Sequence, residues 1–320
     1  MPSAALPTFD DVLAAAARIA AHAHVTPVLR ARALDAEAGC TLHFKAEHLQ
    51  RTGSFKFRGA CNAVWSLDDD HASAGVVTHS SGNHGAALAL AARTRGIPCH
   101  VVVPEGAVNA KRIAIEGYGG VLHPCASTLA AREAACAEVG RSTGATLVHP
   151  YTDPRVIAGQ GTAALELLNT VGALDAVVVP VGGGGLVSGT ALALRALAPG
   201  CRLFAAEPAG AADAHRSLQC GSRITDVIPD TICDGLRATV GAPNLALMQA
   251  HGVEVLLVED AQTVAAMRLL LQRTKQLVEP SSAIALAAIL THPERFAGLR
   301  VGVILSGGNV DLDALPWGAS

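Results

Sequence analysis

A run of four glycines, Gly182 to Gly185, is the strongest chemical signal in this sequence. An apolar, β-branched segment precedes the run, and an Ala/Leu-rich segment follows it directly. A buried strand that enters a helix through such a turn leaves backbone N–H groups free at the helix start, where an anion binds. The pattern therefore predicts a phosphate site. A plain turn that binds nothing is the alternative, although such a turn rarely needs four consecutive glycines.

The turn alone does not decide which phosphate ligand binds. The G-x-G-x-x-G spacing of dinucleotide folds is absent, because Val187 and Ser188 stand where the third glycine would be needed. Glu207 nevertheless ends the next apolar segment, roughly 20 residues on, where a ribose-binding acid would lie. An NAD-dependent oxidoreductase therefore stays open, as does a non-catalytic binding protein for an amino acid. The G-x-x-x-x-G-K-[ST] loop of nucleotide triphosphatases is absent.

Lys56 is the strongest candidate nucleophile. It lies between Phe55 and Phe57 in a chain that has only six phenylalanines. An apolar, aromatic setting disfavours the charged ammonium form, so we expect a neutral and reactive amine. The nearby charge of Arg58 would favour the neutral form further. A solvated lysine at the start of a helix is the alternative.

Two more turns carry polar side chains at the ends of predicted strands. One is the S-S-G-N-H segment at 80–84, and the other is the S-G-G-N segment at 306–309. Small hydroxyl and amide groups beside the free N–H groups of a helix start can hold a carboxylate. Ordinary helix capping is the alternative for the first segment. Because ligands gather beyond the carboxyl ends of strands in open parallel sheets, we expect all three turns to line one cleft.

Short apolar runs alternate with Ala/Leu-rich stretches along most of the chain, which is typical of parallel sheets built from βαβ units. The predicted strands are 75–79, 98–103, 145–149, 175–181, 202–206, 253–258 and 300–305. The predicted helices are 83–95, 127–143, 159–171, 186–198, 261–277 and 281–290. We therefore predict an α/β fold with a large domain, residues 1–66 and 150–320, and a small mobile α/β domain, residues 75–148.

The composition favours a small-molecule substrate. The 320-residue chain has a formal net charge of −3, and its 24 Lys and Arg residues are dispersed, so nucleic acid and anionic membranes are not expected partners. Its eight cysteines form no C-x-x-C pair, which suits free thiols in a reducing cytoplasm. No apolar run reaches about 18 residues, so no transmembrane helix is expected. The first twenty or so residues favour a capped amphipathic helix over a signal peptide.

Four ordered motifs carry a resemblance to a known family: S-F-K-F-R-G-A at 54–60, S-S-G-N-H-G at 80–85, G-G-G-G-L at 182–186 and S-G-G-N-V-D at 306–311. Together they resemble the serine/threonine dehydratases and serine racemases that depend on pyridoxal 5′-phosphate (PLP). The resemblance covers nearly the whole chain, from Pro27 to Asp311. It implies the two-domain, open parallel-sheet architecture of fold type II PLP enzymes, with the cofactor in the cleft between the domains. It also implies a homodimer.

The resemblance assigns a role to each motif. The cofactor-binding residues would be Phe55, Lys56, Asn83, Gly182, Gly183, Gly184, Gly185, Leu186 and Ser306. Lys56 would hold PLP covalently, the glycines with Leu186 would hold its phosphate, and a neutral serine would face its pyridine nitrogen. The substrate carboxylate would be bound by Ser80, Ser81 and His84.

The implied reaction eliminates water from a β-hydroxy L-amino acid of the serine or threonine type, and hydrolysis of the product then gives a 2-keto acid and ammonia. Lys56 would take the Cα proton, and Ser81 would work from the opposite face, which permits racemisation as a side activity. A hydroxyaspartate or phenylserine dehydratase and a serine racemase stay open as alternatives.

A metal site is implied as well. In serine racemase-like relatives, residues at the positions of Glu207, Ala211 and Asp213 hold a divalent cation through two carboxylates and a carbonyl. Such hard oxygen ligands suit Mg²⁺ or Ca²⁺, and a monovalent ion is the alternative. A glutamate and an aspartate on a surface loop that bind nothing would look the same in the sequence.

Three residues bear on the choice of substrate. Tyr151 and Ala238 stand where the resemblance leads us to expect smaller polar groups, and this would favour threonine or an aryl-serine over serine. Arg132 matches a basic residue near the substrate in relatives, so a second carboxylate stays open. The sequence alone favours a surface helix position for Arg132.

Overall fold

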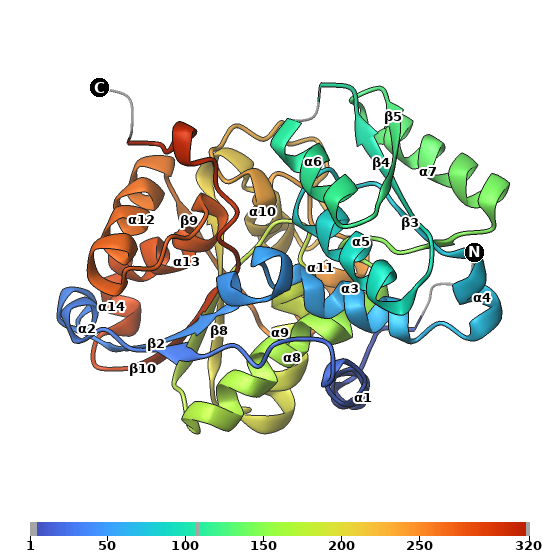
Figure 1. Cartoon of the computed structure of the whole chain (residues 1–320). Coiled ribbons are helices and arrows are strands. Elements are labelled where there is room, and N and C mark those ends of the chain that lie inside the picture. The colour runs from blue at the N-terminus through green and yellow to red at the C-terminus, as the bar shows by residue number, and fades with distance from the viewer. Residues whose placement is uncertain (1–4, 107–108, 318–320) are drawn as a thin grey trace. The chain divides into compact units, whose positions relative to one another are not determined.

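The computed structural model describes residues 5–106 and 109–317, which form helices and strands in alternation (Figure 1). The chain divides into two compact units. The first unit comprises Met1–His24 and Lys56–Gln160, and the second comprises Val25–Phe55 and Gly161–Ser320. The domain boundaries expected from the sequence stay a prediction.

The second unit contains a six-stranded sheet with the order β1-β2-β10-β7-β8-β9. Its strands are β1 (Val28–Leu29), β2 (Thr41–Ala46), β7 (Ala176–Pro180), β8 (Arg202–Pro208), β9 (Glu254–Val258) and β10 (Arg300–Leu305). All neighbours pair in parallel except β1, which runs antiparallel to β2. Every residue of β7 is buried, and a strand covered on both faces needs such a continuous apolar run.

Helices of the second unit cover this sheet. They are α2 (Arg32–Ala38), α9 (Gly185–Leu197), α10 (Asp213–Cys220), α11 (Ala242–Ala250), α12 (Asp260–Thr274), α13 (Pro280–Thr291) and α14 (Pro293–Phe296). The α8 helix (Pro154–Val171) contributes its residues from Gly161 onward. Helix α13 is apolar on all sides because it lies inside the core, where its residues share one cluster with Phe44, Phe204 and Phe296.

The first unit contains a four-stranded parallel sheet with the order β5-β4-β3-β6. Its strands are β3 (Val76–Thr78), β4 (Cys99–Pro104), β5 (Val121–Cys125) and β6 (Thr146–Leu147). Its helices are α1 (Phe9–Ile19), α3 (Lys56–Trp65), α4 (Asp69–Ala74), α5 (Asn83–Arg95), α6 (Asn109–Gly117) and α7 (Leu129–Thr143).

Small residues let the elements of the first unit approach closely. The apolar core holds five alanines of α5 together with residues of α3 and β4. A Cβ atom added to Gly159 would lie only 2.6 Å from the Cα of Gly59, so the start of α8 packs directly on the backbone of α3. This packing fixes the helix that begins with Lys56.

The structure confirms the α/β class and the parallel sheets, and each predicted strand overlaps a strand of the structure. It adds β1, β2 and β5, which the sequence analysis missed. Strand β2 escaped because it contains the charged Lys45, whose ammonium is buried and donates to Thr26 O at 2.6 Å and Glu166 Oε2 at 2.5 Å. All eight cysteines are free thiols. Within residues 5–106 and 109–317, no helix is long and apolar enough to cross a membrane.

Candidate functional site

The glycine turn connects β7 to α9, as expected. A Cβ atom on Gly182 would lie 2.8 Å from the Cα of Leu236, and one on Gly184 would lie 2.7 Å from the Cβ of Asn244. Gly184 also has a φ of +94°, in the left-handed region that favours glycine. No side chain caps the start of α9, and the N–H groups of its first turn have no hydrogen-bond acceptor within the helix. This backbone cradle fits a phosphate group.

The S-G-G-N turn follows β10 in the same unit. Ser306 is buried, and its Oγ donates to the carbonyl of Ser281 at 3.4 Å. Its own carbonyl accepts from the backbone N–H of Phe55 at 2.9 Å, so Phe55 and Ser306 are held side by side. The residue that follows Phe55 in the chain is Lys56.

Glu279 supports this turn, and the sequence analysis did not identify it. Its backbone N–H donates to Gly307 O at 3.0 Å, and its Oε2 accepts from the N–H of Asn309 at 3.2 Å. A Cβ atom on Gly307 would lie 2.8 Å from Glu279 Oε1, so a larger residue there would displace the Glu279 carboxylate. The signal in the sequence was the glutamate directly before the proline that starts α13.

Lys56 is the first residue of α3, in the first unit, and it is partly buried. Its Nζ donates to the carbonyl of Pro150 at 3.1 Å. The two residues after it, Phe57 and Arg58, are fully buried, and the Arg58 guanidinium donates to His24 O at 3.2 Å. The amine therefore lies beside the loop that follows β6.

His84 lies near Lys56 within the first unit. Burial, followed by the charge of Lys56, holds the pKa of His84 well below its usual range, so its ring is neutral. Its Nε2 donates to Val148 O at 3.3 Å. Its Nδ1 is buried, with no hydrogen-bond partner among the residues that the structure describes. A neutral ring here leaves an acceptor atom inside the site.

Ser80, Ser81 and Asn83 lie between β3 and the first turn of α5, where each is partly exposed. Gly82 precedes the helix and provides no side-chain cap, so the first N–H groups of α5 have no partner within the helix. The segment can therefore bind a carboxylate through backbone N–H groups and hydroxyls, as expected from the sequence.

Two histidines that the sequence analysis left without an assigned role lie at this end of the first sheet. Strands β3 and β6 are parallel neighbours, so His79 and His149, which follow them, lie together with ring centroids 5.1 Å apart. His149 also meets Tyr151 edge-on at 4.5 Å. Burial and then the charge of the Arg132 guanidinium lower the pKa of His79, so Arg132 on α7 lies near His79.

Arg132 is less exposed than the surface position that the sequence favours. It is only partly exposed, and its Nε is buried without a hydrogen-bond partner in the described part of the chain. A guanidinium donor without a protein acceptor, beside a turn that can bind a carboxylate, can hold a second anionic group.

Glu207 and Asp213 come together in the second unit. Both are buried, the carboxylate of Glu207 accepts from the N–H groups of Ala214 at 2.7 Å and His215 at 2.8 Å, and Asp213 Oδ2 accepts from the N–H of Val240 at 2.7 Å. Burial, with a smaller contribution from the charge of Asp213, raises the pKa of Glu207 to about 8, and burial raises the pKa of Asp213 to about 6. Two desolvated carboxyls of like charge suit a hard cation that neutralises both. Ala211 ends the short turn between them and is buried.

Glu207 and Asp213 by themselves offer a cation only two side-chain ligands. Within the described ranges, no group of three or more His, Cys, Asp and Glu side chains is arranged to hold a metal ion. Backbone carbonyls or water would therefore have to complete the coordination of a cation at Glu207 and Asp213.

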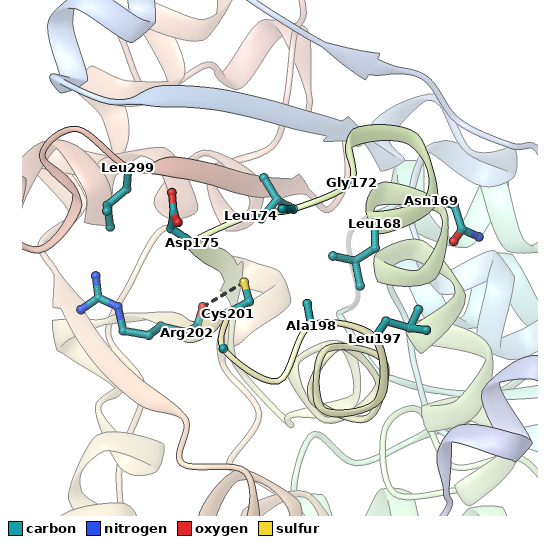
Figure 2. Close-up of a pocket in the computed structure, with 12 residues that line it drawn as sticks. Leu168, Asn169, Gly172, Leu174, Asp175, Leu197, Ala198, Cys201, Arg202 and Leu299 are labelled. Carbon is teal, nitrogen blue, oxygen red and sulfur yellow. Dashed lines mark hydrogen bonds between the residues drawn. The ribbon is translucent and has the colours of Figure 1, made fainter.

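A separate cavity of about 820 Å³ lies in the second unit (Figure 2). Leu174, Asp175, Arg202 and Leu299 line it, and these residues precede or begin β7, β8 and β10. It therefore opens at the amino ends of the parallel strands, whereas the glycine turns follow the carboxyl ends, where ligands of such sheets bind. This cavity is not the site described above.

Comparison with known proteins gives one consistent result. A family model described as pyridoxal-phosphate dependent enzyme matches residues 19–307. The chain is 50% identical over 312 residues to a β-hydroxyaspartate dehydratase of Paracoccus denitrificans (strain Pd 1222), covering 98% of this chain and 99% of the relative. It is 43% identical to an L-threo-3-hydroxyaspartate ammonia-lyase of Saccharomyces cerevisiae, with 96% and 94% covered. The structure of maize serine racemase superposes with a TM-score of 0.93 at 43% identity, covering 96% of this chain and 95% of that one. The chain belongs to the family of pyridoxal-phosphate dependent enzymes.

Proposed function

We propose that this enzyme eliminates water from a β-hydroxyaspartate, and that hydrolysis of the product, which takes up one water again, releases ammonia and oxaloacetate. One observation carries the choice of substrate: the half-buried guanidinium of Arg132, whose Nε has no acceptor within the described chain, lies near His79, the residue before the Ser80–His84 turn. Serine and threonine carry one carboxylate, whereas hydroxyaspartate carries two. The similarity to two relatives named for hydroxyaspartate supports the same choice.

The two carboxylates of the substrate have different partners in this proposal. The α-carboxylate binds the hydroxyls of Ser80 and Ser81 and the backbone N–H groups at the start of α5. The β-carboxylate binds Arg132 through charge-assisted hydrogen bonds, for which a guanidinium has the planar geometry. The neutral ring of His84 adds no competing positive charge.

PLP, when bound, supplies the electron sink that allows the bond between Cα and its hydrogen to break. The glycine turn and Leu186 would hold its phosphate, Lys56 would hold it covalently, Phe55 would pack on its ring, and Asn83 and Ser306 would bind the ring hydroxyl and pyridine nitrogen. Once the substrate amine has displaced Lys56, the freed amine takes the proton from Cα of the substrate. Ser81 can return a proton from the opposite face, which would give a racemase side activity. The family match favours PLP over the NAD-dependent alternative.

Three further features belong to the proposal. Glu207, the carbonyl of Ala211 and Asp213 hold Mg²⁺ or Ca²⁺, and the buried, mutually repelling carboxyls support this. The active form is a homodimer, and the enzyme works in the cytoplasm, in keeping with eight free thiols.

The test is an assay for 2-keto acid release from threo- and erythro-3-hydroxyaspartate, serine, threonine and phenylserine, with wild type and Arg132→Gln. Charged hydrogen bonds contribute about 1.5–3 kcal/mol each, and about 1.36 kcal/mol corresponds to a factor of ten in rate. We therefore expect kcat/KM for hydroxyaspartate to fall by roughly ten- to a hundredfold in Arg132→Gln, with serine turnover unchanged.

Two variants sharpen the assay. Arg132→Lys keeps the charge but loses the planar fork, so its loss should be intermediate. Arg141→Gln is the matched control, because Arg141 lies on the same helix, is exposed and pairs with Glu138. An equal loss for serine and hydroxyaspartate in Arg132→Gln would mean that Arg132 does not select the second carboxylate. A preference of the wild type for serine would remove the proposed substrate.

A further inference from the structure

Two histidines on neighbouring strands of the first unit form a pair that the proposed reaction does not use. His100 lies on β4 and His123 on β5. The Nδ1 atom of His100 is 3.0 Å from the Nε2 atom of His123, and the two rings are tilted by 53° with centroids 5.1 Å apart. Both side chains are partly exposed, so an ion in solution can reach them.

The strand register explains why the rings meet. In the parallel pair of β4 and β5, His100 lies opposite Val121, and Val102 lies opposite His123. Side chains alternate between the two faces of a strand, so His100 and His123 project from the same face, two residues apart along the register. The rigid sheet therefore holds both imidazoles together.

The distance between the nitrogen atoms suits coordination of one ion. Metal–nitrogen bonds to imidazole measure about 2.0–2.1 Å, so two ligands at a right angle lie about 2.9 Å apart and two tetrahedral ligands lie about 3.4 Å apart. The separation of 3.0 Å lies between these values. A direct N···N hydrogen bond also requires one ring nitrogen to present a lone pair, and a metal ion would replace the shared proton.

We propose that His100 and His123 bind a divalent transition-metal ion, Zn²⁺ or Cu²⁺, with water completing its coordination. Imidazole ligands suit these ions, whereas Mg²⁺ and Ca²⁺ prefer oxygen. The side chain of Cys125, two residues beyond His123, donates to Val103 O at 3.5 Å. Among the described residues no third side chain joins the pair in a metal-binding group, so the bound ion keeps open positions. It ties β4 to β5 and stabilises the first unit.

The experiment uses the holoenzyme, stripped of trace metals and kept in excess Mg²⁺. One equivalent of Cu²⁺ is added, and its electron paramagnetic resonance spectrum is recorded for wild type, His100→Gln and His123→Gln. We expect couplings to two nitrogens in wild type and to fewer in each variant. Calorimetric titration with Zn²⁺ should show binding at least about tenfold weaker in both variants, since loss of even an outer partner of a metal ligand has that effect.

Controls separate this site from the other histidines of the chain. His71→Gln removes an exposed histidine on α4 that pairs with Asp68, and it should leave the copper spectrum and the Zn²⁺ affinity unchanged. A crystal of wild type soaked in Zn²⁺ should show anomalous density between His100 and His123, which tests the site even if a variant folds poorly. Density only elsewhere, or unchanged affinity in both variants, would overturn the proposal.

Discussion

The glycine turn at the start of α9 allows a prediction in which two physical effects are separated. Gly182 tests close contact alone, because a Cβ there would meet Leu236 Cα at 2.8 Å while its φ is not in the left-handed region. Gly172 tests backbone strain alone, because its φ is +76° and nothing lies within 4 Å of an added Cβ. Gly184 combines both effects, with a φ of +94° and a contact at 2.7 Å to Asn244 Cβ.

The expected losses of unfolding free energy follow from these differences. A left-handed alanine is less stable than glycine by about 1–2 kcal/mol, and an extra carbon in a packed site by about 1–3 kcal/mol. Gly172→Ala should therefore lose about 1–2 kcal/mol, Gly182→Ala about 1–3 kcal/mol, and Gly184→Ala their sum, about 2–5 kcal/mol. Alanine restricts the unfolded chain equally in all three variants, so this contribution cancels in the comparison.

Urea unfolding of the PLP-free proteins measures these losses, and titration with PLP measures cofactor affinity. We expect weaker PLP binding in Gly182→Ala and Gly184→Ala, and unchanged binding in Gly172→Ala, which lies after α8 and outside the turn. A Gly184→Ala variant no less stable than Gly172→Ala would show that the contact with Asn244 does not restrict the turn. Unchanged PLP affinity in both turn variants would refute the phosphate cradle.

Three further predictions concern the amine, the cation and the buried ring. Lys56→Ala should lose keto-acid release and the pyridoxyl label that borohydride leaves on its peptide, while Lys111→Ala keeps both; a label on another lysine in the wild type would exclude Lys56. Mg²⁺ at a hundred times its Kd should raise the free energy of unfolding by about 2.7 kcal/mol, and the rise should vanish in Glu207→Gln; an equal rise in that variant would place the ion elsewhere. Because burial holds the pKa of His84 well below 6.5, the unfolded state binds a proton that the native state does not, so stability is lost as pH falls below about 6.5. In His84→Asn the slope of unfolding free energy against pH, measured below pH 6, should be shallower by up to about 1.4 kcal/mol per pH unit; an unchanged slope would contradict the neutral buried ring.

The strands and helices that carry the motifs could be predicted because each is locally consistent. The apolar run of β7 and the four glycines after it indicate a buried strand, a tight turn and a helix start without any knowledge of their neighbours. Strand β2 could not be predicted in the same way. Its buried Lys45 is compatible with a strand only because Glu166, which is distant in the chain, supplies the opposite charge.

The sequence by itself determined the chemistry of each motif: a lysine among aromatic residues, a glycine turn for a phosphate, and serines at a helix start for a carboxylate. These follow from residue types over short stretches, where local backbone preferences decide the conformation. Only the tertiary structure decided which distant residues meet. Arg132 lies near His79 because α7 packs on the first sheet, and the two imidazoles of β4 and β5 meet because of strand register. Such contacts depend on long-range packing, which the spacing of residues in the sequence does not reveal.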